Sequence, residues 1–155
     1  MKYLTIAAIL TCAPITAAHA ATDTPIAAIN QFLDSFNKGD VVTAAAAHTD
    51  APVIIDEFAP HLWSGTGALT NWMKDYDTDA KARKITDPAV ALGAPDVDKS
   101  DGSTAYVVLP SIYTFKQDNI AMRQPAHMAF ALTKTNGGWR IAAWTWAGTV
   151  PVKAK

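Results

Sequence analysis

Asp56 is the residue whose place in the sequence best suits acid–base chemistry. It follows Val53-Ile54-Ile55, an apolar run typical of a strand that lines the interior of a protein. A carboxylate at the end of such a strand is partly removed from water, which raises its pKa toward the value that a general base needs. His61 follows within the next loop, so its imidazole could reach Asp56 and be oriented by it. The alternatives are a solvated acid at a strand end and a plain surface histidine.

Glu57 is adjacent to Asp56, but the two are not expected to work as a pair of carboxylates. Neighbouring residues on a strand point to opposite faces of the sheet. One of the two side chains should therefore face the interior, while the other should face solvent.

Aromatic residues form the second set that points to function. Trp72 and Tyr76 share one face of a predicted helix, and Trp144 and Trp146 share one face of a predicted strand. If these faces meet, they form the aromatic wall of an apolar pocket, which is the usual form of a small-molecule site. Plain core packing is the alternative for each of them. The predicted ligand-binding residues are Trp63, Trp72, Tyr76, Tyr113, His127, Trp144 and Trp146.

His127 belongs to this set because it lies in an apolar, strand-like stretch with two alanines on its face, Ala129 and Ala131. Their small side chains would leave room for a ligand beside the imidazole. The alternative is a core or interface histidine that is hydrogen-bonded to a neighbour.

Other chemistries are not indicated by the sequence. No two histidines stand at the i, i+4 spacing of a helical metal site, so we expect no metal. Cys12 is the only cysteine and lies in the predicted leader, residues 1–20, so the mature chain should have no thiol nucleophile. The sequence has no Gly-x-Ser-x-Gly motif, and no cofactor is expected. With 13 Lys and Arg against 14 Asp and Glu, the chain lacks the basic face that nucleic-acid binding requires.

Residues 1–20 have the pattern of a signal peptide. Lys2 is its charged start, the segment 4–15 is apolar, and Ala18-His19-Ala20 is a typical cleavage site. The apolar run is too short for a membrane span of about 20 residues. We therefore expect export to the periplasm or the medium, no membrane attachment after cleavage, and a single domain over residues 21–155.

The elements that would position these side chains are three helices followed by strands. Thr24-Pro25 is a typical helix start, and Gly39 ends that helix. A short helix over 41–47 and a third helix that begins after Gly67 and fades through 77–79 complete the set.

Strands are predicted at 53–56, within 84–97, and at 104–115, 122–135 and 139–147, with a turn at 98–102. Between the last two, Asn136-Gly137 should supply the positive φ angles of a tight hairpin turn. Helices early and strands late predict an α+β fold.

Four short motifs stand within this order of elements: Asn37-Lys38-Gly39-Asp40, Val53-Ile54-Ile55-Asp56, Trp63-Ser64-Gly65 and Gly138-Trp139-Arg140-Ile141. Together with the order they resemble the nuclear-transport-factor-2-like superfamily, which includes ketosteroid isomerases and polyketide cyclases. The resemblance implies a cone-shaped barrel, in which a curved, mostly antiparallel sheet wraps around the N-terminal helices and encloses a pocket. It also implies homodimers formed through the outer face of the sheet.

The comparison with ketosteroid isomerases argues against steroid chemistry. Those enzymes stabilise their intermediate with a tyrosine and a protonated aspartate. Here the first helix offers Phe32 and Phe36 instead of tyrosine, and the two longest predicted strands carry no acid. Tyr106 or Tyr113 could substitute, depending on the strand register.

The leading expectation is therefore an exported protein that binds a small apolar or aromatic molecule without catalysis. The first alternative is a cofactor-independent isomerase, cyclase or hydratase with Asp56 as its base. The second alternative is an interaction scaffold that acts as a homodimer.

Overall fold

The computed structural model describes residues 22–155. The predicted signal peptide, residues 1–20, lies outside the described residues, so export stays a prediction. The helices are α1 (Pro25–Lys38), α2 (Val41–Ala46) and α3 (Ala68–Ala82). The strands are β1 (His48–Ile55), β2 (Leu62–Ser64), β3 (Ile85–Leu92), β4 (Val97–Ser100), β5 (Thr104–Gln117), β6 (Ile120–Thr135), β7 (Gly138–Gly148) and β8 (Val152–Lys153).

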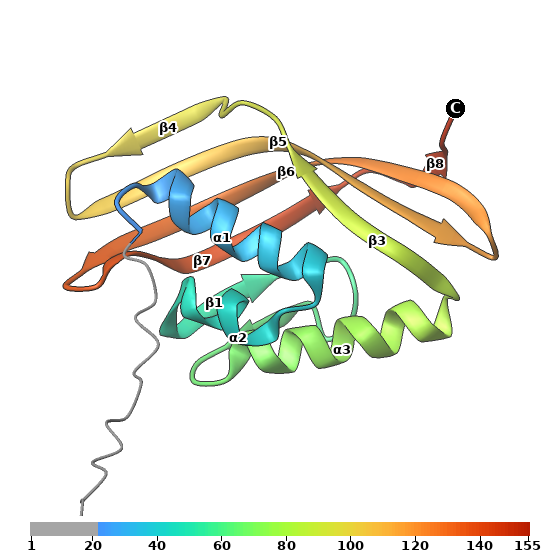
Figure 1. Cartoon of the computed structure of the whole chain (residues 1–155), viewed down its shortest axis with the longest axis horizontal. Coiled ribbons are helices and arrows are strands. Elements are labelled where there is room, and N and C mark those ends of the chain that lie inside the picture. The colour runs from blue at the N-terminus through green and yellow to red at the C-terminus, as the bar shows by residue number, and fades with distance from the viewer. Residues whose placement is uncertain (1–21) are drawn as a thin grey trace, which may run out of the picture.

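The strands form one curved sheet, and the helices lie on its concave side (Figure 1). The sheet order is β2-β1-β7-β6-β5-β3, with β4 paired to β5 and β8 paired to β6. Only the β1–β7 pair is parallel among these pairings. The sheet does not close on itself, so the helices cover one face and leave the other open. The α+β class and the cone-shaped architecture are thus confirmed.

The start and end of α1 follow from its capping residues. The Thr24 hydroxyl accepts a hydrogen bond from the Ala27 N–H at 3.1 Å, and Pro25 occupies the first turn. Gly39 adopts a left-handed φ of 69°, which lets its N–H reach the Phe36 carbonyl. The apolar face that includes Phe32 is buried against the sheet, as the sequence predicts.

Helix α3 continues to Ala82 instead of fading through residues 77–79. Two ion pairs at i, i+4 spacing support its last turns: Lys81–Asp77 at 2.5 Å and Arg83–Asp79 at 3.2 Å. The prediction stopped too early because it followed the apolar stripe alone. The extra turn matters for function because it carries Asp79 and Arg83 to the pocket described below.

Three strand predictions need correction. Strand β1 begins at His48, well before Val53, and the predicted turn at 98–102 instead contains part of β4, which pairs with β5. In the β6–β7 hairpin the positive φ falls on Gly138, at 99°, and not on Asn136 or Gly137. A side chain at Gly138 would also meet the backbone of Thr22 within 2.8 Å. Both the positive φ and this close contact therefore require glycine at position 138.

None of the helices in residues 22–155 has the length and apolar character needed to cross a membrane.

Candidate functional site

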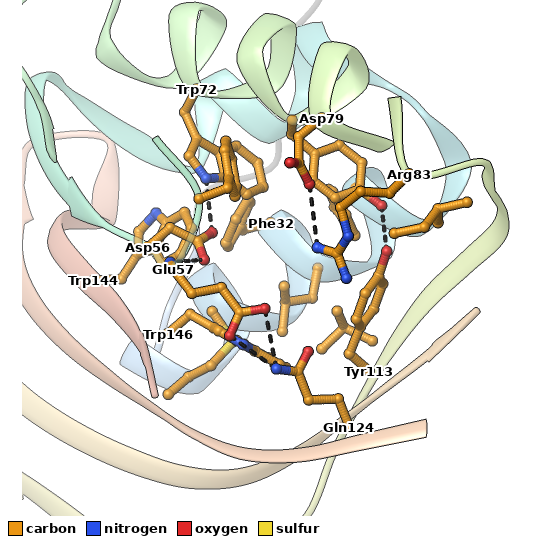
Figure 2. A pocket seen from close by; sticks show the side chains of 17 residues that line it. Phe32, Asp56, Glu57, Trp72, Asp79, Arg83, Tyr113, Gln124, Trp144 and Trp146 are labelled. Carbon is orange, nitrogen blue, oxygen red and sulfur yellow. Dashed lines mark hydrogen bonds and ion pairs between the residues drawn. The ribbon is translucent and has the colours of Figure 1, made fainter. Parts of the chain in front are cut away.

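A pocket opens between the helices α1 and α3 and the concave face of the sheet. Its cavity volume is about 60 Å³, several times the space that one water molecule needs. Most of its wall is aromatic or aliphatic, and the polar groups are few and paired (Figure 2). The lining includes Phe32, Asp56, Glu57, Phe58, Trp72, Tyr76, Asp79, Arg83, Tyr113, Gln124, Trp144 and Trp146.

Asp56 lies on the pocket wall, directly after the last residue of β1. One carboxylate oxygen accepts a hydrogen bond from the Trp72 indole N–H at 2.9 Å, and the other accepts from the Glu57 backbone N–H at 2.7 Å. Burial raises the pKa of Asp56 to about 6, although the Trp72 hydrogen bond acts in the opposite direction. A carboxylate with that pKa can change protonation state near neutral pH, as a general base must.

Glu57 is exposed to solvent, as expected for one of the two acids, but it also belongs to the lining of the same pocket. Strand β1 ends at Ile55, so the alternation of strand faces does not extend to these residues. Both Glu57 carboxylate oxygens accept from the Gln124 side-chain amide, at 3.0 and 2.8 Å. Gln124 is fully buried and also donates to the Thr149 carbonyl. Gly148 packs so closely on this pair that a Cβ there would lie 2.5 Å from the Gln124 amide nitrogen.

Two tyrosine hydroxyls meet in the pocket. Tyr76 from α3 and Tyr113 from β5 are hydrogen-bonded at 2.8 Å. Burial raises the pKa of both phenols, so both stay neutral and keep their protons at physiological pH. Tyr113 therefore faces inward, whereas Tyr106 is exposed on the outer face. The register thus settles which strand tyrosine could act as a hydrogen-bond donor.

The aromatic wall brings together the helix and strand faces singled out in the sequence. Trp72 and Trp144 meet edge to face with ring centroids 5.0 Å apart, and Tyr76 stacks on Trp72 at 5.8 Å. Phe32 contacts Trp144 from α1, at 5.4 Å. Trp146 also lines the pocket and completes the predicted set on β7.

His48 positions Trp144, a role that the sequence does not indicate. The Trp144 indole N–H donates to His48 Nε2 at 3.2 Å, so Nδ1 carries the proton and donates to the Ala44 carbonyl at 2.8 Å. Burial lowers the pKa of His48 to about 4, which keeps the ring neutral. A neutral histidine with both nitrogens bonded fixes the orientation of the Trp144 ring. The sequence held no signal for it, because His48 and Trp144 are far apart in the chain.

Three predicted site residues do not line this pocket. His61 is exposed, and its Nδ1 contacts the backbone carbonyl of Asp56 at 3.3 Å, not the carboxylate. Trp63 is buried in the core and donates its indole N–H to Asp75 at 2.8 Å. His127 lies on the outer face of the sheet and pairs with Asp96 at 3.2 Å. The predicted carboxylate–imidazole pair is therefore not formed.

Three polar lining residues besides Glu57 were not singled out from the sequence: Gln124, Asp79 and Arg83. Gln124 interrupts an otherwise apolar stretch of β6, and Asp79 and Arg83 have the i, i+4 spacing of a helical ion pair. The sequence therefore contains both features, but neither the polar residue in an apolar stretch nor the ion-pair spacing indicates a pocket by itself. Within residues 22–155, no group of three or more His, Cys, Asp or Glu side chains lies close enough together to hold a metal ion.

The chain belongs to the SnoaL-like domain family, whose model matches residues 26–146. This places it in the nuclear-transport-factor-2-like superfamily and confirms the resemblance drawn from the sequence. No curated protein matches the sequence.

Solved structures share the fold at low sequence identity. A ketosteroid isomerase-like protein from Erwinia carotovora atroseptica aligns with a TM-score of 0.63 and 18% identity, over 88% of this chain and 100% of that one. A nuclear-transport-factor-2-like protein from Salmonella enterica gives 0.64 and 18%, over 83% and 87%. A protein from Kribbella flavida gives 0.68 and 13%, over 82% and 89%. At these identities the likeness concerns the fold alone.

Proposed function

We propose that the protein binds a small aromatic or apolar molecule in this pocket. The observation that carries the proposal is the cavity itself, whose wall is made of tryptophan, tyrosine and phenylalanine rings with only a few paired polar groups. Contact with such rings gives an apolar ligand a large hydrophobic contribution, while the polar pairs fix its orientation. The SnoaL-like family membership is compatible with this role.

A second candidate function is proton transfer with Asp56 as the general base. The observation that favours it is the half-buried carboxylate on the pocket wall, held by Trp72, with a pKa of about 6. In the neutral Tyr76–Tyr113 pair one hydroxyl donates to the other, which leaves one O–H donor for the negative charge that develops on a substrate oxygen. The corresponding reaction would be abstraction of a proton next to a carbonyl group, followed by isomerisation, cyclisation or loss of water.

Small aromatic ligands should bind and change the tryptophan fluorescence, because Trp72, Trp144 and Trp146 all line the cavity. The experiment is a titration of the protein with toluene, phenol and 2-indanone, followed through the tryptophan emission. Saturable changes support the binding function. If none of these ligands changes the emission, the pocket is plain core and the proposal is wrong.

The same experiment separates binding from catalysis when Asp56→Asn is included and deuterium exchange at the acidic C–H positions of 2-indanone is followed by NMR. An enzyme should exchange these protons faster than buffer, and Asp56→Asn should slow this exchange at least a hundredfold. A protein that only binds should show no exchange faster than buffer, and Asp56→Asn should hardly change its affinity for toluene. Asp98→Asn, at an exposed position on β4, is the matched control.

We further propose that the chain forms a homodimer through the outer face of the sheet. Apolar side chains on this face include Val53, Ile55, Tyr106 and Ile112, and Tyr106 is 51% exposed. Sedimentation at micromolar concentration should give twice the 16.5 kDa mass of the full chain, or twice that of the processed form if the leader is removed. Tyr106→Lys should shift the protein to the monomer. A monomeric wild type would refute the dimer and leave the ligand proposal intact.

A further inference from the structure

The pocket carries more negative than positive charge. Three carboxylates line it, from Asp56, Glu57 and Asp79, whereas Arg83 supplies the only positive side chain among the lining residues. Arg83 is already paired with Asp79 at 3.2 Å, so this pair is close to neutral. The negative charges of Asp56 and Glu57 therefore have no positive partner among the lining residues.

Asp56 and Glu57 are hydrogen-bonded, but only by neutral donors. Asp56 accepts from the Trp72 indole and from a backbone N–H, and Glu57 accepts from the Gln124 amide. Such bonds satisfy the oxygen atoms without cancelling their charge. Figure 2 shows Asp56 and Glu57 next to each other on one side of the pocket, with the Asp79–Arg83 pair on the other side. Asp56 is half-buried and Glu57 is exposed, so this side of the pocket, including the part open to solvent, is negative.

The aromatic rings add to the same preference. Trp72 and Trp144 stand at 88° to each other, and Tyr76 and Phe58 pack against Trp72 at 5.8 and 6.3 Å. The face of an aromatic ring is the negative side of its quadrupole, and tryptophan attracts cations most strongly. A positively charged group in this pocket would lie among aromatic rings and carboxylates together.

We infer that the pocket selects small organic cations, an ammonium group attached to an aromatic or apolar body, over neutral and anionic molecules of the same size. This inference rests on the proposed binding function and names the class of ligand for that site. The aromatic body would replace water against the rings, and the ammonium group would supply the positive charge that Asp56 and Glu57 lack. Arg83 already shares its charge with Asp79, so an anion would meet little net positive charge at that pair.

The experiment compares three single-ring probes of nearly equal size: benzylammonium, benzyl alcohol and benzoate. Their dissociation constants are measured at pH 7.5 through the tryptophan emission. We expect benzylammonium to bind about tenfold more tightly than benzyl alcohol, and benzoate to bind more weakly than both.

Two variants identify the source of the preference. Glu57→Gln keeps the size of the side chain and one acceptor for Gln124, and it should lower the benzylammonium-to-benzyl-alcohol affinity ratio several-fold. Asp98→Asn removes an exposed carboxylate outside the pocket and should leave the ratio unchanged. A ratio that does not respond to Glu57→Gln, or that responds equally to Asp98→Asn, would contradict the assignment.

The pH dependence gives an independent readout. The charged and titratable groups facing Asp56 are Glu57 after β1, Asp79 of α3, Arg83 directly after α3, and the Tyr76–Tyr113 pair, which stays neutral. Asp56 takes up its proton as the pH falls through about 6, so the preference for benzylammonium should be smaller at pH 5 than at pH 7.5. Asp56→Asn should remove most of this change.

The outcomes distinguish the two proposals. If benzyl alcohol binds as tightly as benzylammonium, the inference about cations is wrong and the binding function stands. If benzoate binds most tightly, Arg83 opens toward the ligand and the inference is also wrong. If none of the three probes binds, the binding function itself fails, and the selectivity for cations fails with it.

Discussion

Replacing Trp144 by alanine should destabilise the protein by about 3–5 kcal/mol and abolish binding of aromatic probes. Trp144 is 3% exposed, and its ring packs against Phe32 and Trp72 at 5.4 and 5.0 Å. The substitution removes these contacts, leaves a cavity, and removes the indole N–H that donates a hydrogen bond to His48 Nε2. Urea denaturation at pH 7.5 measures the stability, and the probe titration measures the binding.

Trp144→Phe is the control for this prediction. It keeps much of the ring surface and loses the indole N–H, so its free energy of unfolding should lie between those of the wild type and the alanine variant. It also keeps the experiment informative if Trp144→Ala does not fold. A loss below about 1 kcal/mol for the alanine variant would mean that the ring is not a main packing element of the pocket wall.

The parts of the structure that the sequence predicted are those that local rules determine. The caps of α1 at Thr24 and Gly39 depend on residues within one turn of the helix. The position of Asp56 depends on an apolar run that ends beside it, and the aromatic wall depends on helical and strand periodicity. Each of these features can be read within a short window of the chain.

The remaining features depend on residues that are distant in the chain. Gln124 reaches Glu57 across 67 positions, and His48 reaches Trp144 across 96. Periodicity assigns a face to such residues but does not say which side chain lies opposite. His127 shows the limit well, because its apolar neighbours indicated a lined pocket, whereas the sheet turns that face outward toward Asp96.

Between pH 4 and 6, His48 and Asp56 together should change the free energy of unfolding of the wild type very little. Each of these two groups alone makes that free energy depend steeply on pH. Burial lowers the pKa of His48 from 6.5 to about 4, so the unfolded chain binds a proton first as the pH falls. The contribution of His48 to the free energy of unfolding is fully present above pH 6.5 and is lost as the pH falls to about 4. At 1.36 kcal/mol per pKa unit, it amounts to about 3 kcal/mol.

Asp56 has the opposite sign. Burial raises its pKa from 3.8 to about 6, so the unfolded chain releases the proton first as the pH rises. Stability is lost between pH 3.8 and about 6, again by about 3 kcal/mol. The two windows overlap and the two slopes have opposite signs, so they largely cancel.

Single variants should reveal the hidden slopes. In Asp56→Asn only the His48 contribution remains, so the free energy of unfolding should rise by up to about 3 kcal/mol from pH 4 to 6.5. In His48→Gln only the Asp56 contribution remains, so it should fall by a similar amount from pH 4 to 6. The double variant should be as flat as the wild type. Urea denaturation at four pH values measures all of them, and a constant offset from a lost hydrogen bond does not affect the slopes.

The two groups are coupled through the pocket wall itself. Asp56 holds Trp72, His48 holds Trp144, and the two indole rings meet edge to face at 5.0 Å. Protonation of either group should therefore weaken the hydrogen bond to its own tryptophan, and a bound ligand that fixes both rings should shift both pKa values. If both single variants keep a flat profile, burial at these two positions is weaker than the structure indicates, and Asp56 would lose the pKa that makes it a candidate base.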